Sequence, residues 1–333
     1  MIEPIYQPAA SRYEDGMTYR RAGRSGVLLP AFSLGMWHNF GSGQAFSNVQ
    51  RMAHYAFDRG ITHFDLANNY GPAYGTAEEN FGRLMERSFR PYRDEMFIAT
   101  KAGYDMWPGP YGNWGSRKYL TASLDQSLRR MKLDYVDIFY SHRHDPETPL
   151  EETLQALVDI VRRGKALYVG LSRYPLEAAR FAFRYLAERD VPCLLFQDRY
   201  NIFSRQPETS GVLSLSAASG SGFVAFSPLA QGLLTGRYLD GIPQDSRMAA
   251  GRSLQREVLT DAMLERLRAL NDIARQRGQT PPEMALAWLL SHEEITTVLI
   301  GASKTQQILD NIKAVQNTSF TAEELAEIDR ISK

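Results

Sequence analysis

Short apolar runs alternate with segments of helical period along this sequence, and the alternation limits the folds that the chain can adopt. Each run is rich in β-branched or aromatic residues and has the length of a strand. Strands that alternate with helices pair in parallel, because each helix returns the chain to the same edge of the sheet. The expected strands are residues 31–37, 61–66, 96–100, 135–141, 166–171, 193–197, 222–227 and 296–300.

Three of the intervening segments carry apolar stripes at helical spacing. Ser47 is the expected N-cap of the first helix, Gly60 closes it, and Gly164 ends the second before the next strand. The stripes are Val49, Met52, Ala53, Ala56 and Phe57; Leu150, Leu154, Leu157, Val158 and Val161; and Leu264, Leu267, Leu270, Ile273 and Ala274.

Repeated strand and helix units of this number predict an α/β protein with a closed (β/α)₈ TIM barrel. The 333 residues exceed the usual length of about 250, and two insertions account for the difference. Residues 18–21 and 27–30 flank a Gly- and Ser-containing turn, so we expect an N-terminal β-hairpin that covers the amino end of the barrel. A long loop between strands 7 and 8, with a polar stretch at 231–256, is an expected lid. We find no linker composition, and we expect residues 1–333 to form a single domain.

The amino-acid composition limits the classes of molecule that this chain is expected to bind. Lys and Arg total 38, as do Asp and Glu, so the formal net charge is zero. A basic footprint for nucleic acid or a polybasic membrane tether is missing, and a small molecule is the expected partner. The lone cysteine, Cys193, lies in an apolar run and is expected to be a buried thiol. The first residues have no signal-peptide pattern and no run approaches a membrane span of ~18 apolar residues, so we expect a cytoplasmic protein.

Other chemistries fit the sequence poorly. Gly41-Ser42-Gly43 imitates a dinucleotide-binding fingerprint, but Phe46 stands at the third glycine position and the glycines come late after the strand. The sequence has no nucleophile elbow, no Walker-type Gly-Lys-Ser/Thr, no Tyr-x-x-x-Lys pair and no Cys cluster for zinc. His142 and His144, with an arginine between them, are a poor set of metal ligands, so no metal site is predicted.

Polar side chains follow three neighbouring strands at the points where these strands end. Asp65 and Tyr70 follow the second strand, Lys101 ends the third, and His142 ends the fourth. In a barrel, the carboxyl ends of the strands share one mouth. Each residue alone has an ordinary structural explanation, but together they predict a site.

This arrangement resembles the aldo-keto reductases over residues 19–331. Asp65 and Tyr70 lie in FDLANNYG, Lys101 in IATKAG and His142 in FYSHR, which match the motifs of the catalytic tetrad in that family. The likeness is greatest to the branch of bacterial L-glyceraldehyde 3-phosphate reductases, through EENFGRL, TKAGYDMWPGPYG, GSRKYL, SLDQSLRRM, LAQGLLTG, GIPQDSRM and VLIGASK. The β subunits of voltage-gated potassium channels resemble the sequence more distantly.

The resemblance implies a role for each tetrad residue. Reduction of a carbonyl by hydride leaves negative charge on oxygen, and Tyr70 would donate the proton there or act as base in the oxidation direction. Lys101 would lower the pKa of this phenol from about 10, and Asp65 would be the counter-ion of the buried Lys101. His142 would hydrogen-bond the substrate oxygen.

The same resemblance implies NADP(H) as the cofactor. Ser172, Arg173 and Gln197 would contact the carboxamide, and Phe226, where many relatives have Tyr or Trp, would stack on the nicotinamide. Arg173 replaces the Asn of many other branches. Lys304 beside the adenosine ribose favours NADPH over NADH. The remaining cofactor residues implied are Trp37, Asp65, Ser227, Pro228, Leu229, Gln231, Gly232, Arg237, Arg247, Gly301, Ser303, Gln307, Asp310 and Asn311.

Two functions remain open at this point. The first is NADPH-dependent reduction of small aldehydes, led by L-glyceraldehyde 3-phosphate and followed by methylglyoxal-like carbonyls. The second is an NADPH-binding, redox-sensing subunit that resembles the channel β subunits. Tyr104, Trp107 and Trp114 either line the substrate pocket or pack their own loop. Arg117, Lys118 and Arg143 either bind a substrate phosphate or face solvent. A homo-oligomer is possible, since relatives range from monomers to octamers.

Overall fold

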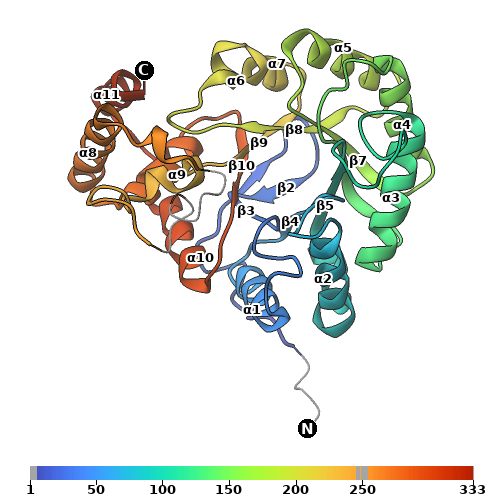
Figure 1. Ribbon diagram of the computed structural model, residues 1–333, viewed down its shortest axis with the longest axis horizontal. Coiled ribbons are helices and arrows are strands. Elements are labelled where there is room, and N and C mark those ends of the chain that lie inside the picture. The colour runs from blue at the N-terminus through green and yellow to red at the C-terminus, as the bar shows by residue number, and fades with distance from the viewer. Residues whose placement is uncertain (1–5, 245–247, 249–253, 333) are drawn as a thin grey trace.

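A closed ring of parallel strands forms the centre of the molecule, with helices around it (Figure 1). The computed structural model describes residues 6–244, 248 and 254–332. Strands pair in the ring order β10-β3-β4-β5-β6-β7-β8-β9, which confirms the predicted (β/α)₈ barrel. The barrel strands are β3 (Phe32–Gly35), β4 (His63–Asp65), β5 (Phe97–Ala102), β6 (Val136–Ser141), β7 (Ala166–Ser172), β8 (Cys193–Arg199), β9 (Gly222–Phe226) and β10 (Ile295–Ile300).

Helices cover the outside of the barrel and bury most residues of the apolar stripes seen in the sequence. All five stripe residues of α1 are fully buried, as a helix packed on a parallel sheet requires. The helices are α1 (Phe46–Phe57), α2 (Thr76–Leu84), α3 (Arg117–Met131), α4 (Leu150–Arg162), α5 (Leu176–Ala187), α6 (Gln206–Thr209), α7 (Val212–Ala218), α8 (Asp261–Gln276), α9 (Pro281–Leu290), α10 (Thr305–Ile312) and α11 (Ala322–Ser332). Short π or 3₁₀ turns are η1 (Met85–Phe89), η2 (Arg90–Glu95), η3 (Ala230–Thr235), η4 (Arg256–Val258) and η5 (Lys313–Gln316).

The first helix begins earlier than predicted. Ala45 occupies the N-cap position of α1 without a side-chain hydrogen bond, so Ser47 is not the cap. The ring of Phe46 lies 3.7 Å from the guanidinium of Arg83 on α2, and this packing draws Phe46 into the helix. Gly60 has a positive φ of 79°, which suits its predicted place at the end of the helix.

An antiparallel hairpin of β1 (Tyr19–Arg21) and β2 (Leu28–Pro30) closes one end of the barrel, as predicted. Leu29 is fully buried in one cluster with the barrel residues Leu195 and Val224. The backbone N–H of Arg24 donates to the carbonyl of Gly220, just before β9, so the hairpin lies at the amino ends of the strands. The opposite end, where the strands finish, is left for a site.

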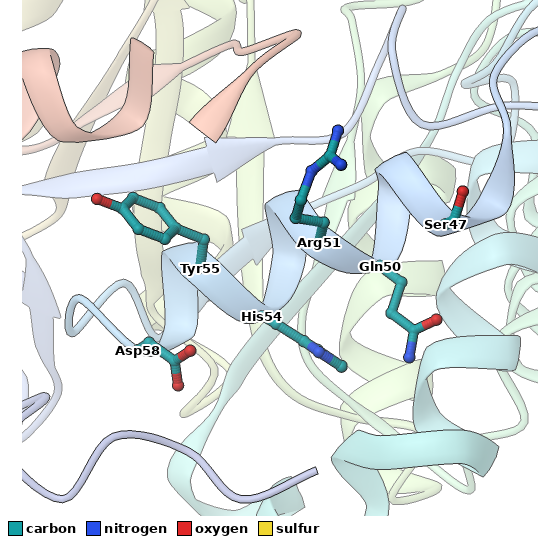
Figure 2. Close-up of a pocket in the computed structure, with 6 residues that line it drawn as sticks. All are labelled: Ser47, Gln50, Arg51, His54, Tyr55 and Asp58. Atoms are coloured by element: carbon teal, nitrogen blue, oxygen red, sulfur yellow. The ribbon is translucent and has the colours of Figure 1, made fainter. Parts of the chain in front are cut away.

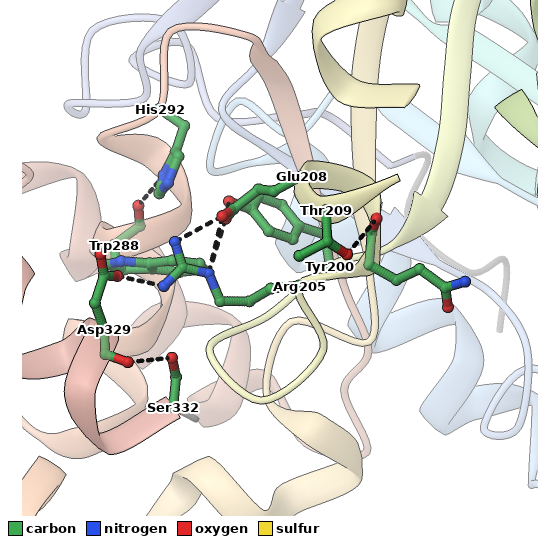
Figure 3. Close-up of polar contacts among 9 residues, drawn as sticks. Tyr200, Arg205, Glu208, Thr209, Trp288, His292, Asp329 and Ser332 are labelled. Atoms are coloured by element: carbon green, nitrogen blue, oxygen red, sulfur yellow. Dashed lines mark hydrogen bonds and ion pairs between the residues drawn. The ribbon is translucent and has the colours of Figure 1, made fainter. Parts of the chain in front are cut away.

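Polar contacts hold the last helix against the segment that follows β8 (Figure 3). Arg205 donates to Glu208 at 2.7 Å and also pairs with Asp329 of α11. The guanidinium carbon of Arg205 lies 5.1 Å from the centre of the Trp288 ring on α9. Tyr200 donates to the same Glu208, so this carboxylate accepts from two side chains of the segment.

Residues 245–247 and 249–253 lie outside the described part of the chain. Arg247, an expected cofactor residue, is among them, and so is part of the expected lid. Within the described ranges, the structure contains no helix that is long and apolar enough to span a membrane.

Candidate active site

A buried lysine joins two of the expected catalytic residues at the mouth of the barrel. Lys101 in β5 donates from Nζ to Oδ2 of Asp65 at 2.6 Å, to the carbonyl of Leu66 at 2.7 Å and to the hydroxyl of Tyr70 at 3.3 Å. The side chains of Lys101 and Asp65 are fully buried. Because an ammonium has three donors, these contacts use all of them and compensate the charge that burial desolvates.

The loop after β4 fixes the position of Tyr70. The N–H of Asn68 donates to the carbonyl of Lys101 at 2.9 Å, so the loop continues along the neighbouring strand. The Tyr70 ring lies between those of Trp37, with centroids 5.9 Å apart, and His142, with centroids 5.8 Å apart. Half of Trp37 is exposed, which makes it part of the wall of the mouth.

His142 follows β6 directly and completes the group of four. Its N–H donates to the carbonyl of Ala102 at 2.9 Å, and its ring meets the Tyr104 ring edge to face at 4.7 Å. Nδ1 of His142 is buried and has no hydrogen-bond partner in the described part of the chain. The structure thus brings together the four residues that the strand-end pattern grouped.

Burial sets the protonation states of this group. It raises the pKa of Tyr70 well above its ordinary value, with the Asp65 charge acting in the same direction. This net direction is opposite to the lowering that we expected beside Lys101, and loss of hydration is its largest cause. Burial lowers the pKa of Lys101, against the opposing effect of Asp65. Burial also lowers the pKa of His142 well below 6.5, aided by Lys101 and two arginines.

A second buried carboxylate lies behind the lysine and was not anticipated. Glu78 on α2 is fully buried, accepts from the hydroxyl of Thr100 at 2.5 Å and pairs with Arg130 of α3. The charge of Glu78 also favours the protonated form of Lys101. An acidic residue in the first turn of a helix is common, so the sequence offered no signal that this one points inward.

The comparison with known proteins agrees with this geometry. The sequence profile of the Aldo/keto reductase family matches residues 31–333, which includes the whole barrel. The chain belongs to the aldo/keto reductase family. It is therefore an oxidoreductase, and enzymes of this family generally use NAD(P)H.

Individual relatives cover most of this aldo/keto reductase. L-glyceraldehyde 3-phosphate reductase of Escherichia coli (strain K12) is 56% identical over 318 residues, which are 94% of this chain and 92% of that protein. A probable voltage-gated potassium channel subunit beta of Oryza sativa subsp. japonica is 35% identical over 305 residues, which are 90% and 91% of the two chains. The corresponding putative subunit of Schizosaccharomyces pombe is also 35% identical, over 321 residues.

Expected cofactor residues of this aldo/keto reductase lie at the carboxyl ends of the later strands. Ser172 ends β7 and Gln197 lies in β8, and both side chains are buried. Gln197 donates to Oδ1 of Asp65 at 3.1 Å, which places it next to the tetrad. Phe226 ends β9 and is partly exposed, so one face can receive a ring.

The loop after β9 suits a phosphate group. Ser227, Ala230, Gln231 and Gly232 have positive φ angles of 54°, 47°, 60° and 108°. Left-handed residues in a short turn direct backbone N–H groups to one side and form an anion-binding concavity. Each non-glycine residue in this region costs roughly 1–2 kcal/mol, which is the kind of strain found at binding sites. Oε1 of Gln231 is buried and unpaired within the described ranges, as expected for a site that a polar ligand completes.

Residues expected at the adenosine end follow β10. A Cβ on Gly301 would meet no atom within 4 Å, so the space is open. Oε1 of Gln307 accepts from the N–H and the hydroxyl of Ser303. Pro228, Leu229 and Arg237 follow β9, while Lys304, Asp310 and Asn311 lie at the start of α10 or within it.

The structure also bears on two other residues weighed from the sequence, Arg117 as a contact for a substrate phosphate and Gly41 as part of a dinucleotide fingerprint. Arg117 pairs with Asp159 of α4 on the outside of the barrel. A Cβ on Gly41 would lie 2.4 Å from the Pro72 ring, so close packing of two loops, and not a pyrophosphate, requires that glycine. This agrees with the rejection of the dinucleotide fingerprint.

An open cavity of about 400 Å³ lies elsewhere, on the outer face of α1 (Figure 2). Its lining includes His54 and Asp58, whose side chains already contact Ser88 and Tyr6. All six lining residues come from one helix or the residue after it, and none of them belongs to the tetrad. This surface cavity therefore does not coincide with the residues at the barrel mouth.

Proposed function

We propose that the protein reduces small aldehydes to alcohols with NADPH, that L-glyceraldehyde 3-phosphate is the leading substrate, and that methylglyoxal-like carbonyls come next. The Lys101 ammonium, held between the buried Asp65 and the Tyr70 hydroxyl, is the observation that carries this proposal. The 56% identity to proteins named L-glyceraldehyde 3-phosphate reductase supports the choice of substrate.

Tyr70 is the proposed general acid. Bound NADPH supplies a hydride to the carbonyl carbon, and the carbonyl oxygen gains negative charge. A phenol whose pKa is raised by burial keeps its proton until that charge develops, and then donates it to the oxygen. The phenolate that remains lies beside the Lys101 ammonium, which stabilises it. Asp65 keeps Lys101 charged in a dry site.

His142 is the proposed orienting donor for the substrate oxygen. Its depressed pKa keeps the imidazole neutral at pH 7, so it donates one hydrogen bond and does not compete for the proton of Tyr70. Its edge-to-face contact with Tyr104 fixes the plane of the ring. A carbonyl oxygen between Tyr70 and His142 would therefore have two hydrogen-bond donors, as in an oxyanion site.

NADPH is the proposed cofactor because of Lys304. This side chain is exposed at the start of α10 and has no ion pair in the described part of the chain. An unpaired cation beside the ribose attracts a 2′-phosphate. We propose that Ser172 and Gln197 hold the carboxamide, that Phe226 covers the nicotinamide ring, and that the loop after β9 holds the pyrophosphate.

The test is steady-state consumption of NADPH with L-glyceraldehyde 3-phosphate, methylglyoxal and 4-nitrobenzaldehyde, beside the Tyr70→Phe variant. We expect fast turnover by the wild type, and a loss of at least about 100-fold in kcat for Tyr70→Phe while NADPH binding, followed by fluorescence, persists. If the wild type turns over none of the three faster than the variant does, the proposed reductase activity is wrong.

The second candidate is a redox-sensing subunit that binds NADPH and acts through a protein partner. The identity of 35% to proteins named as potassium channel β subunits is the observation in its favour. A sensor should release its cofactor slowly. Stopped-flow measurement of NADPH release separates the two, because release slower than about one event per minute is incompatible with typical enzyme turnover.

A further inference from the structure

Arg143, the residue after His142, has its guanidinium fixed between two aromatic rings. The guanidinium carbon lies 3.6 Å from the centre of the Trp114 ring and 4.2 Å from that of Tyr104. Nε donates to the carbonyl of Gly103 at 2.7 Å, and one terminal nitrogen donates to Oδ1 of Asn113 at 2.9 Å. An arginine held by two hydrogen bonds and two rings has lost most of its rotamer freedom before any ligand binds.

The loop that carries one of these rings is strained. Trp114 has a φ of 71°, in the left-handed region that a bulky residue rarely adopts. Oδ1 of Asn113 accepts from the N–H of Trp114 at 2.7 Å and from Arg143, while Nδ2 of Asn113 donates to Asp105. The strained backbone at Trp114 therefore holds the indole over the guanidinium of Arg143. Such strain persists where function requires the geometry.

Arg143 is only partly exposed, yet it has no carboxylate partner among the residues that the structure describes. Two other partly buried arginines do have one: Arg93 pairs with Asp137, and Arg130 with Glu78. Two of the five N–H donors of Arg143 are used by the protein, and three remain. A half-buried cation without a counter-ion lacks the compensation that desolvated charges usually have.

The position of this cation relates it to the reacting carbonyl. Tyr104, which lies against the Arg143 guanidinium, also meets the His142 ring at 4.7 Å. Arg173 donates to the hydroxyl of the same Tyr104 at 3.0 Å, so positive charge gathers on one side of the mouth. In a three-carbon phosphorylated aldehyde, the phosphate is attached two carbons from the carbonyl. It must therefore bind close to the residues that hold the carbonyl oxygen.

We propose that Arg143 binds the phosphate of the substrate and is the residue that makes the enzyme prefer phosphorylated aldehydes. A planar guanidinium matches two phosphate oxygens at once, which a lysine ammonium cannot do. The inference rests on the reductase activity proposed above and adds its specificity-determining residue. Tyr104 and Trp114 are positioning residues in this scheme, because they hold the guanidinium and need not touch the substrate.

The experiment compares two substrates that differ only in the phosphate: L-glyceraldehyde 3-phosphate and L-glyceraldehyde. For Arg143→Gln we expect kcat/KM to fall about 100-fold with the phosphorylated substrate and less than about fivefold with the other. Arg143→Lys, which keeps the charge, should lie between wild type and Arg143→Gln. Inorganic phosphate should inhibit the wild type competitively and lose this effect in Arg143→Gln. Lys118→Gln is the matched control, since Lys118 is a cation whose ammonium lies over a different ring, 5.1 Å from the centre of Tyr111.

Each outcome decides between the proposals. If Arg143→Gln loses activity equally with both substrates, Arg143 supports the fold of the site and does not bind phosphate. If the wild type reduces both aldehydes equally well, this inference fails while the reductase activity stands. If the wild type reduces neither substrate, nor methylglyoxal, the proposed function fails and the inference falls with it.

Discussion

Gln197 donates a hydrogen bond to Oδ1 of Asp65 while Lys101 takes Oδ2, so a residue of β8 reaches across the barrel to one of β4. The carboxylate is fully buried, and its two oxygens depend on separate partners. This contact ties the strands that carry the proposed acid to those that carry the cofactor residues. Changes on either side should therefore affect both.

Replacement of Gln197 by Leu should destabilise the protein. It leaves Oδ1 of Asp65 unpaired in a buried site, which costs about 1–3 kcal/mol of unfolding free energy. Urea denaturation followed by circular dichroism measures the change. Gln206→Leu, at an exposed position of α6, is the control and should shift the free energy by less than about 0.5 kcal/mol. Equal effects of the two substitutions would contradict the buried contact.

Removal of the charge of Lys101, alone or together with that of Asp65, should affect stability and turnover differently. Lys101→Met leaves Asp65 as an uncompensated buried charge and should cost about 3–5 kcal/mol of stability, together with nearly all turnover. The double variant Lys101→Met/Asp65→Asn removes both charges and should regain most of the stability but none of the activity. Denaturation and NADPH oxidation assays measure the two effects. Recovery of activity in the double variant would exclude a catalytic role for Lys101.

Because of His63, the free energy of unfolding should fall in acid. Burial lowers its pKa from 6.5 to about 4, while the hydroxyl of Ser33 contacts Nδ1 at 2.7 Å. Because the unfolded chain binds the proton first, stabilisation is complete above pH 6.5 and is lost as the pH falls towards 4, by about 3 kcal/mol. His63→Asn keeps a hydrogen-bonding group near Nδ1 but cannot titrate. The difference in unfolding free energy between pH 7 and pH 4.5 should be smaller in this variant than in the wild type. The depressed pKa of His142 acts in the same direction and remains in both proteins.

The single cysteine should be chemically inert in the folded protein. Cys193 is buried, and burial raises the pKa of its thiol to about 12, so very little thiolate exists at pH 8. Alkylation by iodoacetamide at pH 8 should be at least about 100-fold slower in the native state than in urea. Similar rates in the two states would mean that β8 opens readily.

Gly170 should not tolerate a side chain. A Cβ at this position in β7 would lie 2.3 Å from ring carbons of Tyr140, which is fully buried inside the barrel beside Lys101. Gly170→Ala should therefore lower the melting temperature by several degrees and reduce turnover, because Tyr140 must move. Gly26→Ala is the control, since a Cβ there meets nothing within 4 Å. Calorimetry of the two variants is the measurement.

The barrel could be predicted from the sequence because its strands are buried on both faces and separated by helices. The ends of the strands were predicted less accurately. The second strand was expected over residues 61–66, whereas β4 is His63–Asp65. The predicted N-cap of α1 was wrong by two residues, Ser47 instead of Ala45, and Phe46 at the start of the helix contacts Arg83 of another helix. Long-range packing of this kind leaves no local signal in the sequence.

The spatial grouping of Asp65, Tyr70, Lys101 and His142 could be predicted because they follow consecutive strands, whose ends must meet in a barrel. The predicted direction of the pKa shift of Tyr70 was wrong, because the loss of hydration depends on how the folded barrel surrounds the phenol. Glu78 was missed for a similar reason: its inward orientation depends on how α2 packs against α3. Site residues can thus be located by strand order, whereas their electrostatics require the folded molecule.

Closure of the ring has a consequence for synthesis of the chain. β3 pairs with β10, the last strand made, through Phe32 and Val298. While a ribosome is still translating the segment between them, β3 has one edge without a neighbour, and each new strand exposes another. Open edges are templates for aggregation, and long-range pairing is slow. The nascent protein therefore has open edges until its final barrel strand emerges, and a chaperone that shields strand edges would help it up to that point.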